Sequence, residues 1–393
     1  MDAIKSKIQE FKDKANSFMT PSTNITTTIS NNISKANNIA NNLINSTSNN
    51  SITNQSPKKS NNFILIVGIF IAFILFLVLY FLSKTYRVSL ALDTHNIYQK
   101  YTTISSIPYE KEQIAKLRLA DVSVASSYNS CLVGYQMLDY VSLEVLEKTI
   151  QSGARFVEFQ IFNSEYGEDS VPIVSNGYKD GEWKMTVDKV FFEDCAKVID
   201  EHAFQIGDGE NGVPNPDDPL FISLNLKTNH NLYCLDMLSD IIVDYFRDRL
   251  LSNKYSYQQN EIADITMEEL KGRVIILSSE GFEGSKLDEV VNYSWGMKGM
   301  RRMHYSELEN ADSRQIQAYN KRGITLVEPH KEGDFWTQNF NPQRAYDLGC
   351  QFVLMNWQHV DENMDKYITK FRRNSIVAKP KKLRRDDKKQ SKT

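Results

Sequence analysis

The feature that most constrains this chain is an apolar run from Phe63 to Leu82, which contains no charged residue and only Gly68 as a weak point for a helix. A helix of these 20 residues rises 1.5 Å per residue and spans about 30 Å, the thickness of a bilayer's hydrocarbon core. A signal peptide does not fit, because about sixty residues precede the run. A buried core helix does not fit either, because such helices normally carry a polar face. The sequence therefore predicts one transmembrane helix over residues 63–82, with the lipid bilayer as a partner.

The orientation of this helix is not determined by the charges beside it. Lys58 and Lys59 flank one end and Lys84 and Arg87 the other, so the positive-inside rule favours neither side. The four cysteines are widely spaced and match neither a zinc-ligand pattern nor a disulfide framework. Buried, reduced thiols fit a cytosol-facing domain. We therefore expect a single-pass membrane protein whose C-terminal region lies in the cytosol.

The residues before the apolar run have a different character. Residues 1–20 place apolar side chains at helical spacing, which predicts a short amphipathic helix that lies on a membrane surface or pairs with another helix, or else frays in water. Residues 21–62 are dominated by Asn, Ser and Thr and cannot bury enough apolar surface to offset their chain entropy. They are expected to form a disordered or loosely helical stalk.

Residues 83–120 are expected to be a connector, and residues 121–385 to be the globular region. In the globular region short apolar, strand-like runs alternate with amphipathic helical stretches. The expected strands are residues 155–162, 220–224, 273–277, 323–327 and 351–357, and the expected helices are 187–202, 232–251 and 344–348. Repeated βα units favour an α/β fold of the TIM type, a closed (β/α)8 barrel. A doubly wound parallel sheet is the alternative.

Charge separates the globular region from the end of the chain. The net charge of −3 gives no overall basic field, so a nucleic-acid partner is not expected. The stretch from Lys379 to Lys392 is nevertheless strongly basic, and its last residues, 386–393, form a basic tail. Such a stretch is either a solvated, frayed tail or a contact with anionic phospholipid headgroups.

Within residues 121–385 a series of motifs resembles the X and Y boxes of eukaryotic phosphoinositide-specific phospholipase C. The X-like part covers residues 122–279 and the Y-like part residues 291–385. The motifs of the X-like part are Ser127-Tyr128-Asn129-Ser130-Cys131, Gly153-Ala154-Arg155-Phe156-Val157-Glu158, Pro172 to Gly177 and Leu270-Lys271-Gly272-Arg273. Those of the Y-like part are Asn339-Phe340-Asn341-Pro342, Gly349-Cys350-Gln351 and the Lys379-Pro380 to Leu383-Arg384 ending. The resemblance implies the catalytic barrel of that family.

The two positions where the family carries catalytic histidines hold Tyr128 and Asn176. General acid–base transfer needs a group that titrates near neutral pH. A tyrosine has a reference pKa near 10 and an asparagine does not titrate. The resemblance therefore implies a site without its acid and base.

The family's calcium ligands correspond to Asn129, Glu158, Gln160 and Asn225, so two carboxylates have become amides. Calcium takes six to eight oxygens and gains affinity from ligand charge. With one carboxylate left, the resemblance implies weak or absent calcium binding. No cofactor is expected, and calcium is expected only if the chain is an active enzyme.

The family's substrate contacts are also replaced. The positions of its two lysines and one arginine correspond to Leu277, Ser279 and Leu326, while a Ser-Glu pair persists at Ser306. Phosphorylated headgroups are normally held by cations. The scattered His230, His304 and His330 are expected to have surface or structural roles. Arg301-Arg302 is expected to form a solvated turn, with a contact to lipid as the alternative.

These positions together predict a membrane-anchored phospholipase C-like pseudoenzyme that acts as a binding or scaffolding module, with an unidentified protein partner. The alternative is an active phosphoric diester hydrolase that cleaves phosphoinositides with a rebuilt site. The alternative predicts a new cluster of His, Asp, Glu or Lys at the C-terminal mouth of the barrel.

Overall fold

The computed structural model describes residues 60–385, apart from 165–168, 178–183, 208–211, 257–261, 332–333 and 337. The predicted amphipathic helix over residues 1–20, residues 21–59 of the predicted stalk and the basic tail 386–393 lie outside the described residues. The chain divides into two units, Met1–Phe81 and Leu82–Thr393, of which the second holds the barrel.

The predicted span belongs to a longer helix, α3 (Ser60–Lys100), which passes Leu82 and ends at Lys100. Among the described residues it is the one helix that is long and apolar enough to cross a membrane. The connector predicted over residues 83–120 is therefore helical in its first half. No Gly or Pro occurs between residues 83 and 100, so nothing in the sequence ends the helix there.

A nearly closed parallel barrel forms the body of the second unit. Its strands run in the order β7-β6-β5-β2-β1-β10-β9-β8, and each neighbouring pair is parallel. The strands are β1 (Val122–Ser127), β2 (Phe156–Asn163), β5 (Leu220–Lys227), β6 (Val274–Ser278), β7 (Tyr293–Ser294), β8 (Met300–His304), β9 (Ile324–Glu328) and β10 (Phe352–Met355). Over the described residues no strand pairing joins β7 to β8, so the barrel is open at that seam. The TIM-type prediction is confirmed, and the doubly wound alternative is wrong.

Three further strands attach to this barrel. β3 (Pro172–Ser175) pairs antiparallel with β2, and β4 (Val190–Phe191) pairs antiparallel with β3. β11 (Ile376–Ala378) pairs antiparallel with the first half of β1. The β2–β3 register sets Ser175 opposite Gln160, which carries the next residue, Asn176, to the C-terminal end of the barrel.

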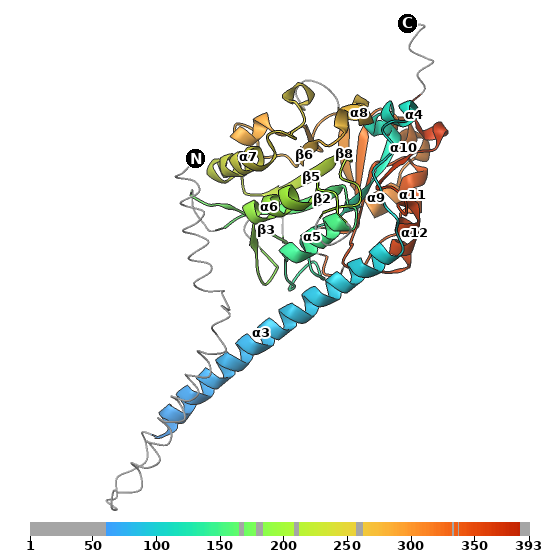
Figure 1. Cartoon of the computed structure of the whole chain (residues 1–393). Helices are drawn as coiled ribbons and strands as arrows, with labels where there is room; N and C mark the ends of the chain where they lie inside the picture. The colour runs from blue at the N-terminus through green and yellow to red at the C-terminus, as the bar shows by residue number, and fades with distance from the viewer. Residues whose placement is uncertain are drawn as a thin grey trace, which may run out of the picture. The chain divides into compact units, whose positions relative to one another are not determined.

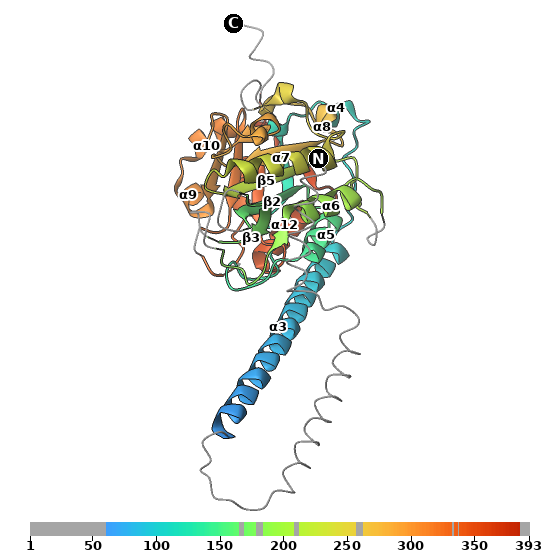
Figure 2. The ribbon, with the colours of Figure 1, turned by 90° about the vertical axis from the view of Figure 1, so that its left-hand side faces the viewer.

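Helices cover the outside of the strands (Figures 1 and 2), and side-chain caps begin several of them. Ser142 caps α5, Asn231 caps α7, Asp312 caps α10 and Asp361 caps α12. The helices after α3 are α4 (Glu112–Ala115), α5 (Leu143–Gln151), α6 (Phe192–His202), α7 (Leu232–Phe246), α8 (Met267–Leu270), α9 (Tyr305–Asn310), α10 (Ser313–Asn320), α11 (Gln343–Asp347) and α12 (Glu362–Lys370).

Two segments differ from their predicted boundaries because tertiary contacts intervene. The helix predicted from Val187 begins only at Phe192, since Val190 and Phe191 before it form β4 and are held extended by pairing with β3. Helix α7 ends at Phe246 instead of Leu251. There the chain turns, and the amide of Leu251 donates to the carbonyl of Val274 at 3.0 Å.

The inside of the barrel is closed by aromatic side chains. The rings of Phe156 and Phe221 lie 4.6 Å and 5.0 Å from that of Phe352, and all three are fully buried. These contacts make the interior a packed core below the mouth, so a ligand can enter only at the mouth.

The burial of the cysteines and of Lys379 can be compared with what the sequence predicted. All four cysteines are free and buried, as expected for reduced thiols. Lys379, in contrast, does not belong to a solvated tail, since it is 1% exposed and its Nζ donates to the carbonyls of Ala120 and Asn320 at 2.5 Å and 3.2 Å. Burial lowers the pKa of Lys379 to about 7.

Candidate functional site

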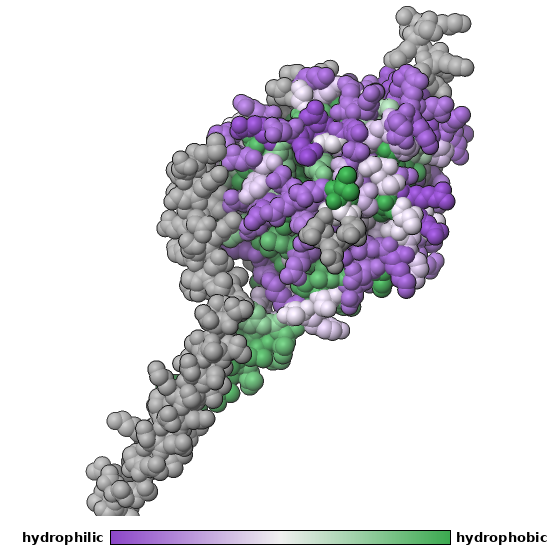
Figure 3. Space-filling model, viewed as in Figure 1, coloured by the Kyte–Doolittle hydropathy of each residue, from purple (hydrophilic) through white to green (hydrophobic). Residues whose placement is uncertain are grey.

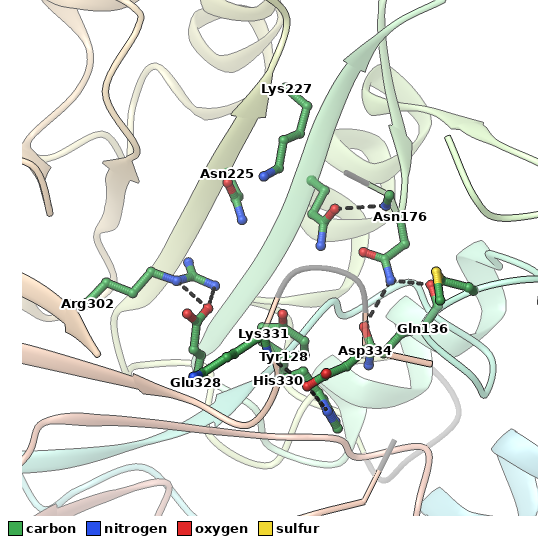
Figure 4. A pocket seen from close by; sticks show the side chains of 13 residues that line it. Tyr128, Gln136, Asn176, Asn225, Lys227, Arg302, Glu328, His330, Lys331 and Asp334 are labelled. Atoms are coloured by element: carbon green, nitrogen blue, oxygen red, sulfur yellow. Dashed lines mark hydrogen bonds and ion pairs between the residues drawn. The ribbon is translucent and has the colours of Figure 1, made fainter. Parts of the chain in front are cut away.

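A cavity of about 340 Å³ lies at the C-terminal ends of the strands, and its volume is at the small end of the range for small-molecule sites. Tyr128 directly follows β1, Asn176 directly follows β3 and His330 lies two residues after the end of β9, while Asn225 and Lys227 lie on β5. This is the end of a (β/α)8 barrel at which active sites are built. Figure 4 shows Arg302 and Glu328 together on one side of the cavity and Asn176 and Gln136 on the other.

The side that carries Asn176 is an amide cluster, made of Asn129, Gln136, Gln160, Asn176 and Asn356. Asn129 Nδ2 donates to Gln136 Oε1 at 2.8 Å and to Asn176 Oδ1 at 3.3 Å. Asn176 Nδ2 donates to the carbonyl oxygen and Oε1 of Gln136 at 2.5 Å and 2.9 Å. Gln160 Nε2 donates to Asn129 Oδ1 at 3.2 Å, and Gln136 Nε2 donates to Asn356 Oδ1 at 3.1 Å. Asn176 is thus held as a hydrogen-bonding member of a buried network.

Tyr128, the other position of a family histidine, is 5% exposed, and its ring centroid lies 5.9 Å from that of His330. Burial, aided by the nearby charge of Glu328, raises the pKa of the Tyr128 phenol well above its ordinary value. The phenol therefore stays protonated and cannot serve as a base near neutral pH.

The opposite side of the cavity is organised by Arg302, which the sequence interpretation placed in a solvated turn. That interpretation is wrong, because Arg302 lies on β8 and its side chain is only 11% exposed. Its Nη1 and Nη2 donate to the two carboxylate oxygens of Glu158 at 2.6 Å and 3.1 Å. Its Nε donates to Glu328 at 2.6 Å. A cation thus lies against the one carboxylate left among the predicted calcium ligands.

These contacts allow the predicted calcium positions to be tested. Glu158, 0% exposed, accepts from Arg302 and also from the Ser223 hydroxyl at 3.2 Å. Asn129 Oδ1 accepts from Gln160 Nε2, and Gln160 Oε1 accepts from the amide of Gly177 at 3.1 Å. Three of the four positions have their oxygens engaged, and the fourth, Asn225, is neutral. Calcium needs several oxygens with negative charge, so the residues present do not fit it. Among the described residues no group of three or more His, Cys, Asp or Glu is placed to hold a metal ion.

The charges at Glu158 and Arg302 are strongly coupled. Burial raises the pKa of the Glu158 carboxyl, and the Arg302 guanidinium acts against that shift. Burial also acts to lower the pKa of Arg302, but the charges of Glu158 and Glu328 outweigh it and raise the pKa well above its ordinary value. The guanidinium is therefore permanently charged.

The three histidines have different surroundings, and for one of them the sequence expectation is incomplete. His230 is exposed and its Nδ1 lies 3.1 Å from the carbonyl of Gly281, while His304 caps α9. His330, in contrast, lines the cavity. Its position two residues after the end of a parallel strand is the signal that could have identified it.

His330 belongs to a titratable group at the mouth, with Lys227, Glu328, Lys331 and Asp334. This is the kind of cluster that the active-enzyme alternative predicts. His330 is held on both sides, however, since Nε2 lies 2.7 Å from Asn356 Nδ2 and Nδ1 lies 3.6 Å from Asp334 Oδ2. Burial lowers the pKa of His330 to about 4, so the imidazole is neutral near pH 7.

The predicted substrate positions do not meet at this cavity. Leu277 and Leu326 are fully buried in the core inside the barrel. The hydroxyl of Ser279 accepts from the amide of Leu226 at 2.9 Å, and Ser306 lies in the first turn of α9, where its hydroxyl is 2.7 Å from His304 Nδ1. None of the four lines the cavity. The cations that do line it are Lys227, Arg302 and Lys331.

The loop that carries Gln136 into the cavity is tied to the C-terminal part of α3. Arg87, 22% exposed, forms an ion pair with Asp139, and its guanidinium lies 4.5 Å from the ring centroid of Tyr135. Further along the helix, Tyr98 is 1% exposed and packs on Trp357 with ring centroids 4.5 Å apart. Residues 82–100 are thus a structural part of the barrel unit, which the sequence interpretation missed.

Comparisons with known proteins agree with this fold. Residues 116–280 match the model of the phosphatidylinositol-specific phospholipase C X domain, and residues 270–382 match that of its Y domain. The 1-phosphatidylinositol 4,5-bisphosphate phosphodiesterase eta-2 of Mus musculus is 26% identical over 183 residues, which is 44% of this chain and 10% of that protein. The eta-1 protein of Mus musculus is 31% identical over 86 residues, 22% of this chain and 5% of that protein.

Solved structures show the same likeness. The crystal structure of S. officinalis PLC21 superposes with a TM-score of 0.58 at 21% identity and covers 70% of this chain and 38% of that chain. That of L. pealei PLC21 gives a TM-score of 0.57 at 20% identity, with 69% and 38% covered. The chain thus spans a small part of the curated relatives and well under half of these structures. From the matched X and Y domains and the barrel that they form, the chain belongs to the phosphatidylinositol-specific phospholipase C family.

Proposed function

We propose that this chain is a membrane-anchored phospholipase C-like protein whose barrel binds ligands or partners at a membrane and does not hydrolyse phosphoinositides. The observation that carries the proposal is the state of the two family histidine positions. Asn176 cannot titrate and is bound into the amide cluster, and Tyr128 is held protonated by burial. General acid–base catalysis at these positions has no group to use.

Two features support a membrane location. The first is α3, whose apolar part has the length and composition of a span. The second is an aromatic group at the rim, Tyr135, Phe335 and Trp336, with ring centroids 5.0–5.5 Å apart. Trp336 is 61% exposed, and nearby Leu138 is 67% exposed. The face of the barrel drawn in Figure 3 is largely hydrophilic. Exposed aromatic and apolar side chains such as Trp336 and Leu138 are candidates for contact with the interfacial region of a bilayer.

The cytosolic side remains the proposed location of the barrel, since its four thiols are free and buried. Protease protection of the full chain in sealed vesicles tests this. Digestion of a C-terminal tag only after the membrane is permeabilised would place the barrel on the lumenal side.

The second candidate function is an active phosphoric diester hydrolase, and the group around His330 is the observation that favours it. A neutral imidazole beside Asp334 in a cavity with Lys227 and Lys331 has the residue types of a rebuilt site. Against it, both imidazole nitrogens have partners, and a pKa of about 4 makes His330 a weak base.

The experiment that separates the two uses the full chain reconstituted in vesicles that contain phosphoinositides. Release of water-soluble inositol phosphates is measured with and without calcium, beside the variants Glu158→Gln and His330→Gln. We expect no release above protein-free vesicles from any of the three proteins. Calcium-dependent release lost in Glu158→Gln, or release lost in His330→Gln, would establish the hydrolase and refute the proposal.

A further inference from the structure

The guanidinium of Arg302 occupies an unusual place for a barrel side chain, because it lies at one side of the mouth cavity and meets two carboxylates there. Strand alternation sends neighbouring residues to opposite faces. Arg301 accordingly lies away from the cavity, with its guanidinium 3.9 Å from the ring centroid of Tyr319 and its Nε donating to Thr325. Arg302 lines the cavity.

The contacts of Arg302 are those of a specific cation site. Both outer nitrogens bind Glu158 in a bidentate arrangement, and Nη2 also lies 2.5 Å from Glu328 Oε2. The guanidinium carbon is 5.1 Å from the ring centroid of Trp295, which adds a cation–π contact. The bidentate geometry joins charge to direction, so the arginine is held in one place.

Glu158 needs such a partner. Its side chain is 0% exposed, and an ionised carboxylate buried without a counter-charge is strongly unfavourable. The Ser223 hydroxyl, which also donates to this carboxylate, carries no charge. Arg302 is the cation in direct contact with this carboxylate among the described residues.

We propose that Arg302 is a resident cation that takes the place of a divalent metal at Glu158, so that the mouth is assembled without a metal ion and excludes one. A metal at Glu158 would have to displace a bidentate guanidinium. It would also have to take oxygens from Asn129 and Gln160, which already accept N–H donors. The proposal concerns the site of the proposed function, but it holds whether or not that site turns over a substrate.

The test is thermal unfolding of the full chain in nanodiscs, with calcium or magnesium chloride titrated into the wild type, Arg302→Ala and the double variant Arg302→Ala/Glu158→Gln. Arg301→Ala is the matched control, since it removes the same side chain from the same strand on the other face. A metal present at a hundred times its dissociation constant raises Tm by several degrees. We expect no metal-dependent shift in the wild type or Arg301→Ala. We expect a lower Tm in Arg302→Ala that calcium raises, and no such rise in the double variant.

A calcium-dependent rise in the wild type's Tm as large as that of Arg302→Ala would overturn the proposal, and so would a folded Arg302→Ala that no cation stabilises. If Arg302→Ala does not fold, Arg302→Gln is titrated in its place, and the wild-type titration still decides whether the native site takes a metal. Turnover in the vesicle assay that does not depend on calcium would refute the proposed function and leave this inference standing. Calcium binding by the wild type without turnover would refute this inference and leave the proposed function standing.

Discussion

Lys379 offers a direct test of the barrel's packing, because a lysine buried at the base of β1 is costly to keep charged. Its Nζ donates to the carbonyls of Ala120 and Asn320, and the desolvation of the ammonium lowers its pKa to about 7. The variant Lys379→Met removes the charge and keeps most of the volume. Both carbonyls retain a donor, since Gln351 Nε2 lies 3.3 Å and 3.1 Å from them.

The magnitude follows from linkage. The gap between a folded pKa of about 7 and the ordinary value of 10.5, at about 1.36 kcal/mol for each pH unit, sets an upper limit of roughly 5 kcal/mol on the cost of the charge. Two lost hydrogen bonds offset about 1 kcal/mol each. We therefore expect Lys379→Met to be more stable than the wild type at pH 7, by at most about 3 kcal/mol or several degrees in Tm.

The sign of the pH dependence is also determined. Between pH 7 and 10.5 the unfolded lysine binds more protons than the folded one, so the wild type gains stability as the pH rises through this window. The advantage of Lys379→Met should therefore shrink from pH 7 to pH 10. Thermal unfolding of both proteins in nanodiscs across this range measures it. Parallel stability profiles, or a variant less stable at pH 7, would refute the reasoning.

Three further outcomes are expected. The double variant Tyr128→His/Asn176→His should show no release of inositol phosphates in the vesicle assay, because the two histidines restore neither the calcium ligands nor the cations at the family's substrate positions. Turnover would show that these two substitutions alone had inactivated the site. Arg87→Met should lower Tm by a few degrees, since a charged hydrogen bond to Asp139 contributes about 1.5–3 kcal/mol. The same variant should speed hydrogen exchange in residues 133–139. Lys84→Met, which breaks a more exposed ion pair, should cause a smaller loss of Tm. The four buried thiols should react with a thiol reagent only on unfolding, and fast labelling of the native chain would contradict their burial.

Much of the fold could be predicted because its signals are local. Alternating apolar strands and amphipathic helices identify a parallel barrel, and the strands from Phe156, Leu220, Val274 and Ile324 begin within one residue of the predicted positions. The boundaries that were wrong, at β4 and at the end of α7, depend on pairing with strands distant in sequence.

Some residues of the candidate site could be predicted from the sequence and others could not. Tyr128 and Asn176 were identified from the sequence, because the identity of a residue in a motif needs no structure. Arg302 and His330 were not, because their roles depend on which face of a strand they occupy and what lies opposite. A guanidinium that pairs with a carboxylate 144 positions away in the chain cannot be distinguished by sequence from one in a solvated turn.

The sequence alone thus determined the apolar segment, the family of the barrel and the replacement of two histidines, since each is a property of consecutive residues. Only the tertiary structure decided that α3 continues onto the barrel, that Lys379 is buried and that Arg302 lies against Glu158. The physical reason is that burial and electrostatic pairing are properties of the assembled barrel. The same charged side chain is solvated in an open segment, whereas in this packed interior it must find a counter-charge or accept a shifted pKa.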